Sequence, residues 1–387
     1  MLNPLPRKFQ AKLLFSPNKT VIGRVVKEET VIKARPDSIL ITEFFRNNCD
    51  YSDYAGILAI NEIVPIDSFS KLPSVYGIIP SEHSLTDGDV IAIQPTGTIR
   101  VLYRIKSLHN DLFVTRRCNS LCIMCSQPPA QSDDSDLLAE NQRVIELADK
   151  STSVLGITGG EPTLLKEDLI KLISYCNFRL PETHLHLLTN GRLLRNEDYT
   201  KKLAAISHLK LTVAIPLYSD IDSEHDYIVQ AKKGFEQTVL GILNLARYKI
   251  PIELRVVIHK LNFFRLPRIA EFIYRNLTFA SHVALMALEP IGLAVVNMDK
   301  LWIDPVEYGA QLSEATLFLA ARGINVSIYN HQLCTVPKSI RPFCRQSISD
   351  WKMAYLPCCD LCSSMSGCGG FFESAINRYH SLHIKPF

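Results

Sequence analysis

Three cysteines at short intervals, Cys118, Cys122 and Cys125, constrain this 387-residue chain more than any other feature. Thiolates at this spacing can wrap one compact centre of a soft metal, and they follow a short apolar run at 112–115 that predicts a strand. A structural zinc site or a fully ligated iron–sulfur cluster takes four ligands, but the next cysteine in the sequence is the distant Cys176. Three ligands leave one metal position open, which favours a catalytic centre. The alternative is a zinc site completed from elsewhere in the chain.

The region 107–330 alternates between apolar runs and helical periodicity. Phe235, Val239, Ile242 and Ala246 recur at the spacing of one helix face. Strands that alternate with helices are typical of a parallel sheet. The pattern allows a closed barrel, a partly closed barrel or a doubly wound sheet. Six apolar runs predict the strands: 112–115, 154–158, 185–189, 209–217, 252–258 and 282–288.

Two regions with different sequence patterns flank residues 107–330, as expected for a chain longer than a typical single domain. Residues 1–106 are rich in short strand patterns, and a turn at 95–97 between two of them predicts a hairpin. Residues 331–387 are rich in Cys, Ser and Gly with little periodicity, which predicts a small loop-rich segment held by metal. We therefore expect a β-rich N-terminal domain, an α/β domain over 107–330 and a cysteine-rich C-terminal segment.

A second motif, Gly159-Gly160-Glu161-Pro162, follows the predicted strand 154–158. Paired glycines let a backbone approach a ligand closely, although a plain strand-to-helix turn would also explain these four residues alone. One strand–helix unit after the three cysteines, the motif makes the chain resemble the radical S-adenosylmethionine (SAM) superfamily. The resemblance implies a partial (β/α)6 barrel with a β-rich N-terminal domain and a C-terminal iron–sulfur cap.

The resemblance also implies cofactors and roles. Cys118, Cys122 and Cys125 would hold a [4Fe–4S] cluster whose open iron chelates SAM, and cleavage of SAM would yield a 5′-deoxyadenosyl radical. For Arg255, a structural ion pair is an equal alternative, because a buried guanidinium needs a partner. No residue is marked as a catalytic acid, base or hydrogen donor. The expected SAM contacts are Met124, Gly159, Gly160, Glu161, Pro162, Asn190, Ser219 and Arg255.

A second group of cysteines lies near the C-terminal end of the sequence. Four cysteines can fully ligate one further [4Fe–4S] cluster, and the expected ligands are Cys344, Cys359, Cys362 and Cys368. Their spacing resembles the auxiliary-cluster caps of radical SAM peptide maturases. Cys334 and Cys358 compete with Cys344 for the fourth position, and a zinc knuckle is the alternative to a cluster.

Further details resemble the C-type radical SAM maturase of His-Xaa-Ser systems over residues 80–375. They include Cys125-Ser-Gln-Pro-Pro129, Ser347-Ile-Ser-Asp-Trp351-Lys and Cys368-Gly-Gly-Phe-Phe372. The implied substrate is a ribosomally made precursor peptide, and the implied partners are a second radical SAM maturase and an electron donor. The rival functions are a radical SAM enzyme acting on tRNA or a small molecule, and a non-catalytic metal-binding scaffold.

Bulk composition narrows these functions only slightly. Apolar residues make up 47% of the chain, enough for a sizeable core, and the formal net charge is +3, which weakly disfavours a nucleic-acid partner. No signal peptide and no membrane span are evident in the sequence, so we expect a cytoplasmic protein.

Overall fold

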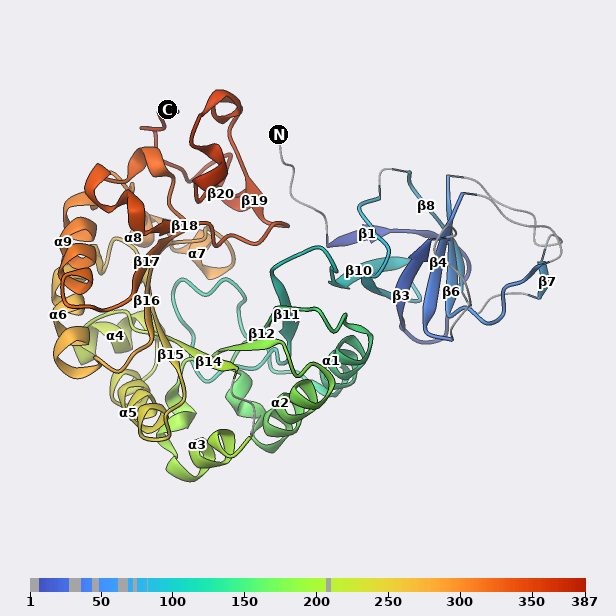
Figure 1. Cartoon of the computed structure of the whole chain (residues 1–387), viewed down its shortest axis with the longest axis horizontal. Coiled ribbons are helices and arrows are strands. Elements are labelled where there is room, and N and C mark those ends of the chain that lie inside the picture. Colours follow the sequence, from blue (N-terminus) through green and yellow to red (C-terminus); the bar gives the residue numbers. More distant parts are fainter. Residues whose placement is uncertain are drawn as a thin grey trace.

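The computed structural model describes residues 7–27, 36–43, 49–61, 69–71, 75–81, 83–206 and 210–387. Its first part is an eight-stranded mixed sheet in the order β1-β10-β9-β3-β4-β6-β8-β2 (Figure 1). The predicted hairpin is confirmed: β9 and β10 pair in antiparallel fashion, and Gly97 in the turn has a φ of 82°. The strands are β1 (Lys8–Gln10), β2 (Lys12–Phe15), β3 (Val21–Lys27), β4 (Ser38–Thr42), β6 (Gly56–Ile60), β8 (Tyr76–Ile79), β9 (Val90–Ile93) and β10 (Thr98–Tyr103), with β5 (Cys49–Asp50) and β7 (Phe69–Lys71) paired separately.

The second part is a sheet of eight parallel strands that follow one another in chain order, from β11 to β18. The first six correspond to the predicted strands. β17 and β18 extend the sheet, and β18 lies in the segment that we expected to be separate; with four and two residues, both are too short for periodicity to reveal. The strands are β11 (Asn110–Phe113), β12 (Val154–Thr158), β13 (His184–Leu188), β14 (Leu211–Pro216), β15 (Ile252–Ile258), β16 (His282–Ala287), β17 (Val326–Tyr329) and β18 (Cys344–Arg345).

Helices cover the outer face of this parallel sheet, which curves into an open arc with β11 and β18 at its two edges (Figure 1). Leu254 and Val256 of β15 are fully buried in a core cluster that also contains Ile269 and Ile273 of α6. The fold is therefore α/β and is built as a partial barrel. The helices are α1 (Ser135–Leu147), α2 (Glu167–Arg179), α3 (Glu197–Ala204), α4 (Asp222–Val229), α5 (Gly234–Arg247), α6 (Leu266–Asn276), α7 (Leu293–Val296), α8 (Met298–Leu301) and α9 (Gly309–Ala320).

The N-terminal sheet contacts the barrel through α1. Arg24 Nε donates to the carbonyl of Leu147 at 3.0 Å, and Arg100 Nη1 donates to Glu140 Oε1 at 3.1 Å. The C-terminal segment reaches the same region, where Ser107 Oγ donates to Asp350 Oδ1 at 3.0 Å. Beyond β18, that segment adds only the two-residue strands β19 (Met353–Ala354) and β20 (Phe371–Phe372) and short 3₁₀ helices.

Among the described residues, no helix combines the length and the apolar character needed to cross a membrane.

Packing of β15 against the helices gives a first test. Leu254 is fully buried, so Leu254→Ala should lower the free energy of unfolding by about 2–5 kcal/mol, the usual cost of such a cavity. Leu243→Ala on α5 is the matched control: its side chain is 42% exposed, and we expect a much smaller loss. Urea unfolding measures both, and equal losses would contradict the burial of β15.

Candidate functional site

The cysteines of the first group, Cys118, Cys122 and Cys125, lie in the long loop that joins β11 to α1. Leu121 N donates to the carbonyl of Val229 at 3.1 Å, at the end of α4, and Leu293 N donates to the carbonyl of Cys125 at 2.8 Å, at the start of α7. The loop therefore extends across the carboxyl ends of the strands, from β11 as far as the segment after β16. Parallel α/β folds place their ligands at this edge.

Asp134 holds the two ends of this loop together. Its carboxylate accepts hydrogen bonds from Thr115 Oγ1 at 2.5 Å, Arg116 N at 3.0 Å and Arg117 Nε at 2.7 Å. The side chain is only 3% exposed, so these contacts are shielded from solvent. The backbone just before Cys118 is thereby fixed.

The Gly159-Gly160-Glu161 backbone pairs with this same part of the loop. Gly160 N donates to the carbonyl of Thr115 and Glu161 N donates to that of Arg117, both at 2.8 Å. A Cβ on Gly160 would lie 2.2 Å from the carbonyl oxygen of Arg117, so no other residue fits without movement of the backbone. The Gly-Gly-Glu-Pro motif thus positions the start of the loop that carries the three cysteines.

The carboxylate of Glu161 is fully buried and already hydrogen-bonded. Oε1 accepts from Thr163 N at 3.0 Å and from the hydroxyl of Thr189, while Oε2 accepts from Asn190 N at 2.7 Å. Burial raises the pKa of Glu161, and these hydrogen bonds oppose the rise. The side chain joins the ends of β12 and β13. Its contact with the ammonium group of SAM stays a prediction. Oε2 accepts one hydrogen bond here and retains a lone pair for a further donor.

Arg192 and Asn190 connect the end of β13 to the cysteine loop. Asn190 Nδ2 donates to Asn119 Oδ1 at 2.6 Å, and Arg192 Nη1 donates to Ser120 Oγ at 2.9 Å and contacts the carbonyl of Asn119. Gln237 on α5 accepts from Arg192 Nε at 2.8 Å. Sequence analysis missed Arg192 because nothing local distinguishes it from a solvated arginine after a strand.

The other residues predicted to contact SAM differ in burial and in position along the strands. Met124 is 6% exposed in an apolar cluster with Tyr218, and Pro162 is buried at the start of a 3₁₀ helix. Ser219 Oγ donates to Glu224 Oε2 at 2.7 Å. Arg255 lies deeper, on the inner face of the sheet, where its Nε donates to Glu253 Oε1 at 2.6 Å. The structural ion pair considered for Arg255 is therefore present.

The three thiols fit a metal centre chemically. Burial raises the pKa of all three, and for Cys122 the nearby charges of Cys125 and Cys118 add to this effect, with a resulting pKa of about 12. Neighbouring thiolates in such surroundings need a cation to compensate them, and iron binding would displace their protons. No three His, Cys, Asp or Glu side chains among the described residues converge on one metal ion. In a [4Fe–4S] cluster each thiolate binds a different iron, so such convergence is not required.

Tyr218 stands beside the thiols at the end of β14. Its ring centroid lies 5.7 Å from that of His225 and 6.4 Å from that of His259. Burial lowers the pKa of His225 to about 4 and that of His259 to about 3, so both are neutral at pH 7. On this side the cysteine loop therefore faces aromatic rings and neutral imidazoles, a feature that the sequence did not reveal.

The inner face of the sheet below the loop is polar. Since side chains alternate along a strand and Leu254 faces the helices, Glu253 and Arg255 face inward. His282 Nδ1 lies 2.9 Å and His186 Nε2 3.5 Å from the carboxylate of Glu253. Burial opposes ionisation of Glu253, but its contacts with the two histidines and with Arg255 outweigh burial and hold its pKa well below the ordinary value.

The fold places the cysteines of the second group in different surroundings. Cys359, Cys362 and Cys368 line one pocket, and Cys334 lines it too. Cys344 is buried in the barrel core, and Cys358 is exposed.

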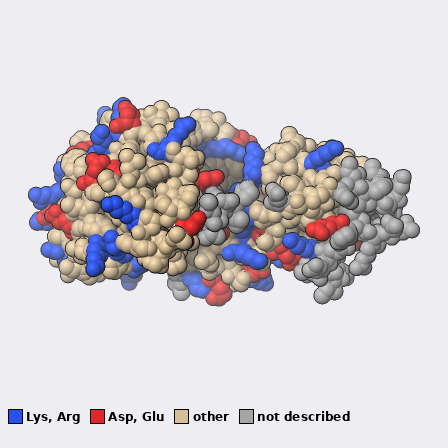
Figure 2. Space-filling view, turned by 90° about the horizontal axis from the view of Figure 1, so that it is seen from above, with Lys and Arg blue, Asp and Glu red and all other residues tan. Residues whose placement is uncertain are grey.

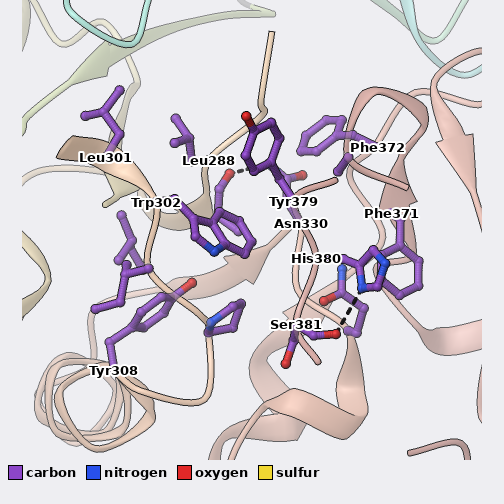
Figure 3. Close-up of a pocket in the computed structure, with 16 residues that line it drawn as sticks. Leu288, Leu301, Trp302, Tyr308, Asn330, Phe371, Phe372, Tyr379, His380 and Ser381 are labelled. Carbon is purple, nitrogen blue, oxygen red and sulfur yellow. Dashed lines mark hydrogen bonds between the residues drawn. The ribbon is translucent and has the colours of Figure 1, made fainter. Parts of the chain in front are cut away.

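A larger aromatic hollow adjoins this pocket and has Gln332 and Phe371 in common with it. It encloses about 470 Å³ of space between atoms, part of it open to solvent, at the rim of the barrel above β15 to β17. Trp302 and Tyr379 lie close together on its walls, with ring centroids 6.1 Å apart (Figure 3).

Comparison with known proteins identifies the class. The Radical SAM superfamily model matches residues 112–273, which contain the cysteine loop and strands β12 to β15. Residues 112–273 therefore form a radical SAM domain, a type of domain whose cofactors are a [4Fe–4S] cluster and SAM.

The individual relatives named below share 28% sequence identity or less with this chain. The chain is 25% identical over 190 residues to a probable GTP 3′,8-cyclase of Saccharolobus islandicus (49% of this chain, 58% of the relative) and 28% identical over 159 residues to the GTP 3′,8-cyclase of Mannheimia succiniciproducens (39% and 45%). It thus spans less than two thirds of the length of these relatives. Among solved structures, Streptococcus suis SuiB bound to S-adenosylmethionine matches with a TM-score of 0.47 and 13% identity, over 57% of this chain and 50% of that one.

The close approach at Gly160 gives a second test. Gly160→Ala should push the Arg117 carbonyl away and cost about 1–3 kcal/mol of stability, as overpacking usually does. Gly367→Ala is the matched control, because an added Cβ there meets nothing within 4 Å. Thermal melts of the two variants compare them. Equal melting temperatures would show that Gly160 is not needed to hold the loop.

The inner-face network predicts a pH dependence. Because the pKa of Glu253 is lowered in the folded state, its ionisation stabilises the fold at neutral pH, and this stabilisation is lost as the pH falls below the unfolded value of about 4.3. Glu253→Gln should cost about 3–5 kcal/mol at pH 7 because it leaves Arg255 without its partner, and the difference from the unchanged protein should narrow toward pH 3. Glu236→Gln, at a 61% exposed side chain on α5, is the control. Urea titrations at several pH values measure this, and a pH-independent difference would contradict the network.

Proposed function

We propose that this chain is an enzyme that reductively cleaves SAM and uses the resulting radical to modify a ribosomally made precursor peptide. The observation that carries the proposal is the placement of Cys118, Cys122 and Cys125 on one loop, held by the Gly160-Glu161 backbone across the strand ends. When bound, the [4Fe–4S] cluster and SAM supply a 5′-deoxyadenosyl radical able to abstract hydrogen.

The chain's own residues would position and shield this chemistry. Arg192 and Asp134 fix the loop, while Met124 and Tyr218 exclude water from one side of it. Below the loop, the inner face offers His186, Glu253 and Arg255 as polar groups for the substrate. His186 Nε2 lies 3.5 Å from the carboxylate of Glu253, so a ligand that binds His186 would compete with this contact.

The peptide substrate is supported by the resemblance over residues 80–375 and by the aromatic hollow, which could bury apolar side chains at the barrel rim. An electron donor is required for SAM cleavage, and a second radical SAM maturase is the further proposed partner. A nucleotide is the second candidate substrate, since two relatives are named GTP 3′,8-cyclase. Lys and Arg side chains are interspersed with Asp and Glu on the face in Figure 2, which gives tRNA no support there.

Two sets of variants separate the cysteine groups by role. Replacing Cys118, Cys122 and Cys125 together by Ala removes every proposed protein ligand to the SAM-binding cluster, so formation of 5′-deoxyadenosine should stop. Replacing Cys359 and Cys362 by Ala should leave 5′-deoxyadenosine formation with a strong chemical reductant but abolish peptide modification. Chromatography of the nucleoside and mass spectrometry of a co-expressed His-Xaa-Ser precursor measure the two steps.

The same assay distinguishes the alternatives. Stimulation by GTP but not by peptide would favour the nucleotide substrate. No 5′-deoxyadenosine from the fully reconstituted protein would reject the enzyme in favour of a scaffold. A thermal melt of each variant checks that the C-terminal segment still folds without its metal.

A further inference from the structure

Four cysteines line one pocket in the C-terminal segment; three of them lie within residues 359–368, and the fourth, Cys334, precedes them in the sequence. Cys334, Cys359, Cys362 and Cys368 line this pocket, which encloses about 340 Å³ of space between atoms. The remaining walls are largely apolar and include Leu333, Tyr355, Met365, Phe371, Ile384 and Phe387. Soft thiolates in an apolar, partly closed pocket favour iron–sulfur or zinc over harder metals.

Backbone contacts bring Cys334 to this pocket. It belongs to a short helix, Leu333–Thr335, that follows β17. Gly369, next to Cys368, packs so tightly that a Cβ on it would lie 2.3 Å from the carbonyl oxygen of His331. Gln332 Nε2 also donates to the carbonyl of Gly370 at 2.6 Å. The segments that carry Cys334 and Cys368 are therefore closely packed and hydrogen-bonded to each other.

Cys344 has a different environment. It lies in β18 opposite Ile328 of β17, and it belongs with Ile328 and Ile340 to the core cluster between the sheet and its helices. Its Sγ lies 4.0 Å from the carbonyl oxygen of Ile340, and the residue is 7% exposed. Cys344 does not line the pocket. The exposed Cys358 does not line the pocket either.

We propose that Cys334, rather than Cys344, is the fourth thiolate of an iron–sulfur cluster held by Cys359, Cys362 and Cys368. The inference deepens the proposed function, because it rests on the assignment of iron to the second cysteine group. It does not depend on SAM cleavage. Since Cys334 lies in the short helix that comes after β17, the cluster would link residues 359–368 to the rim of the barrel.

The pocket also supplies hydrogen bonds suited to cluster sulfurs. Phe387 N donates to Cys362 Sγ at 3.4 Å. A backbone hydrogen bond from Lys385 likewise reaches Cys334. Backbone donors of this kind stabilise thiolate ligands and tune reduction potential. With four thiolates, the cluster has no open iron for a substrate, so its role is to carry electrons or to hold the segment in place.

Paired variants in a background without the SAM-binding cluster test the ligand assignment. In the full chain carrying Cys118, Cys122 and Cys125→Ala, anaerobic reconstitution with ferrous iron and sulfide should give about four irons per chain. Adding Cys344→Ala should leave that number and the electron paramagnetic resonance spectrum of the reduced cluster unchanged. Adding Cys334→Ala should lower the iron content or change the spectrum. Because this background cannot cleave SAM, failure of the proposed catalytic function would leave the result intact.

Alkylation of the unsubstituted holoprotein gives a measurement that does not depend on folding of the variants. Mass spectrometry should find Cys334 protected from iodoacetamide in the reconstituted protein and modified after iron is chelated, with Cys344 unreactive in both states. Loss of iron in the Cys344→Ala variant alone, alkylation of Cys334 while the cluster is intact, or stoichiometric zinc without iron would each overturn the proposal.

Discussion

The contact between the Gly159-Gly160-Glu161 backbone and residues 115–117 is the constraint on which the rest of the site depends. Two hydrogen bonds of 2.8 Å and a glycine with no room for a Cβ hold the start of the cysteine loop against the end of β12. A loop of this length would otherwise have many conformations. The motif acts here on the protein's own backbone, whether or not it also contacts SAM.

Glu161 extends this constraint to the next strand. Its buried carboxylate joins β12 to β13 through Thr189 and Asn190, and Asn190 and Arg192 then bind the cysteine loop from the other side. A buried polar network of this kind is rigid only when each member has its partners. The loop is thus held at both flanks before any metal binds, which lowers the conformational cost of forming the cluster site.

Because side chains alternate along each strand, the two faces of the parallel sheet differ in character. Outward residues such as Leu254 and Val256 supply the apolar core, while inward residues such as Glu253 and Arg255 form a charged network below the cysteine loop. The aromatic hollow and the four-cysteine pocket lie at the rim, toward the β17 side of the arc. In the proposed function, substrate would enter between these rim features and the SAM-binding loop.

The sequence by itself determined the features that are local in the chain: six strands alternating with helices, the 95–97 hairpin turn, the three-cysteine spacing and the Gly-Gly-Glu-Pro turn. Each depends on neighbouring residues, so periodicity and residue type suffice. Only the tertiary structure revealed the hydrogen bonds of the buried Glu161 carboxylate, the partner of Arg255, the contacts of Arg192 with the cysteine loop, and the pocket that Cys334 and Cys368 both line. These depend on which distant segments the folded backbone brings into contact. The sequence favoured Cys344 over Cys334 as the fourth ligand, yet Cys334 lines the pocket, while the pairing of β17 with β18 places Cys344 opposite Ile328 in the core.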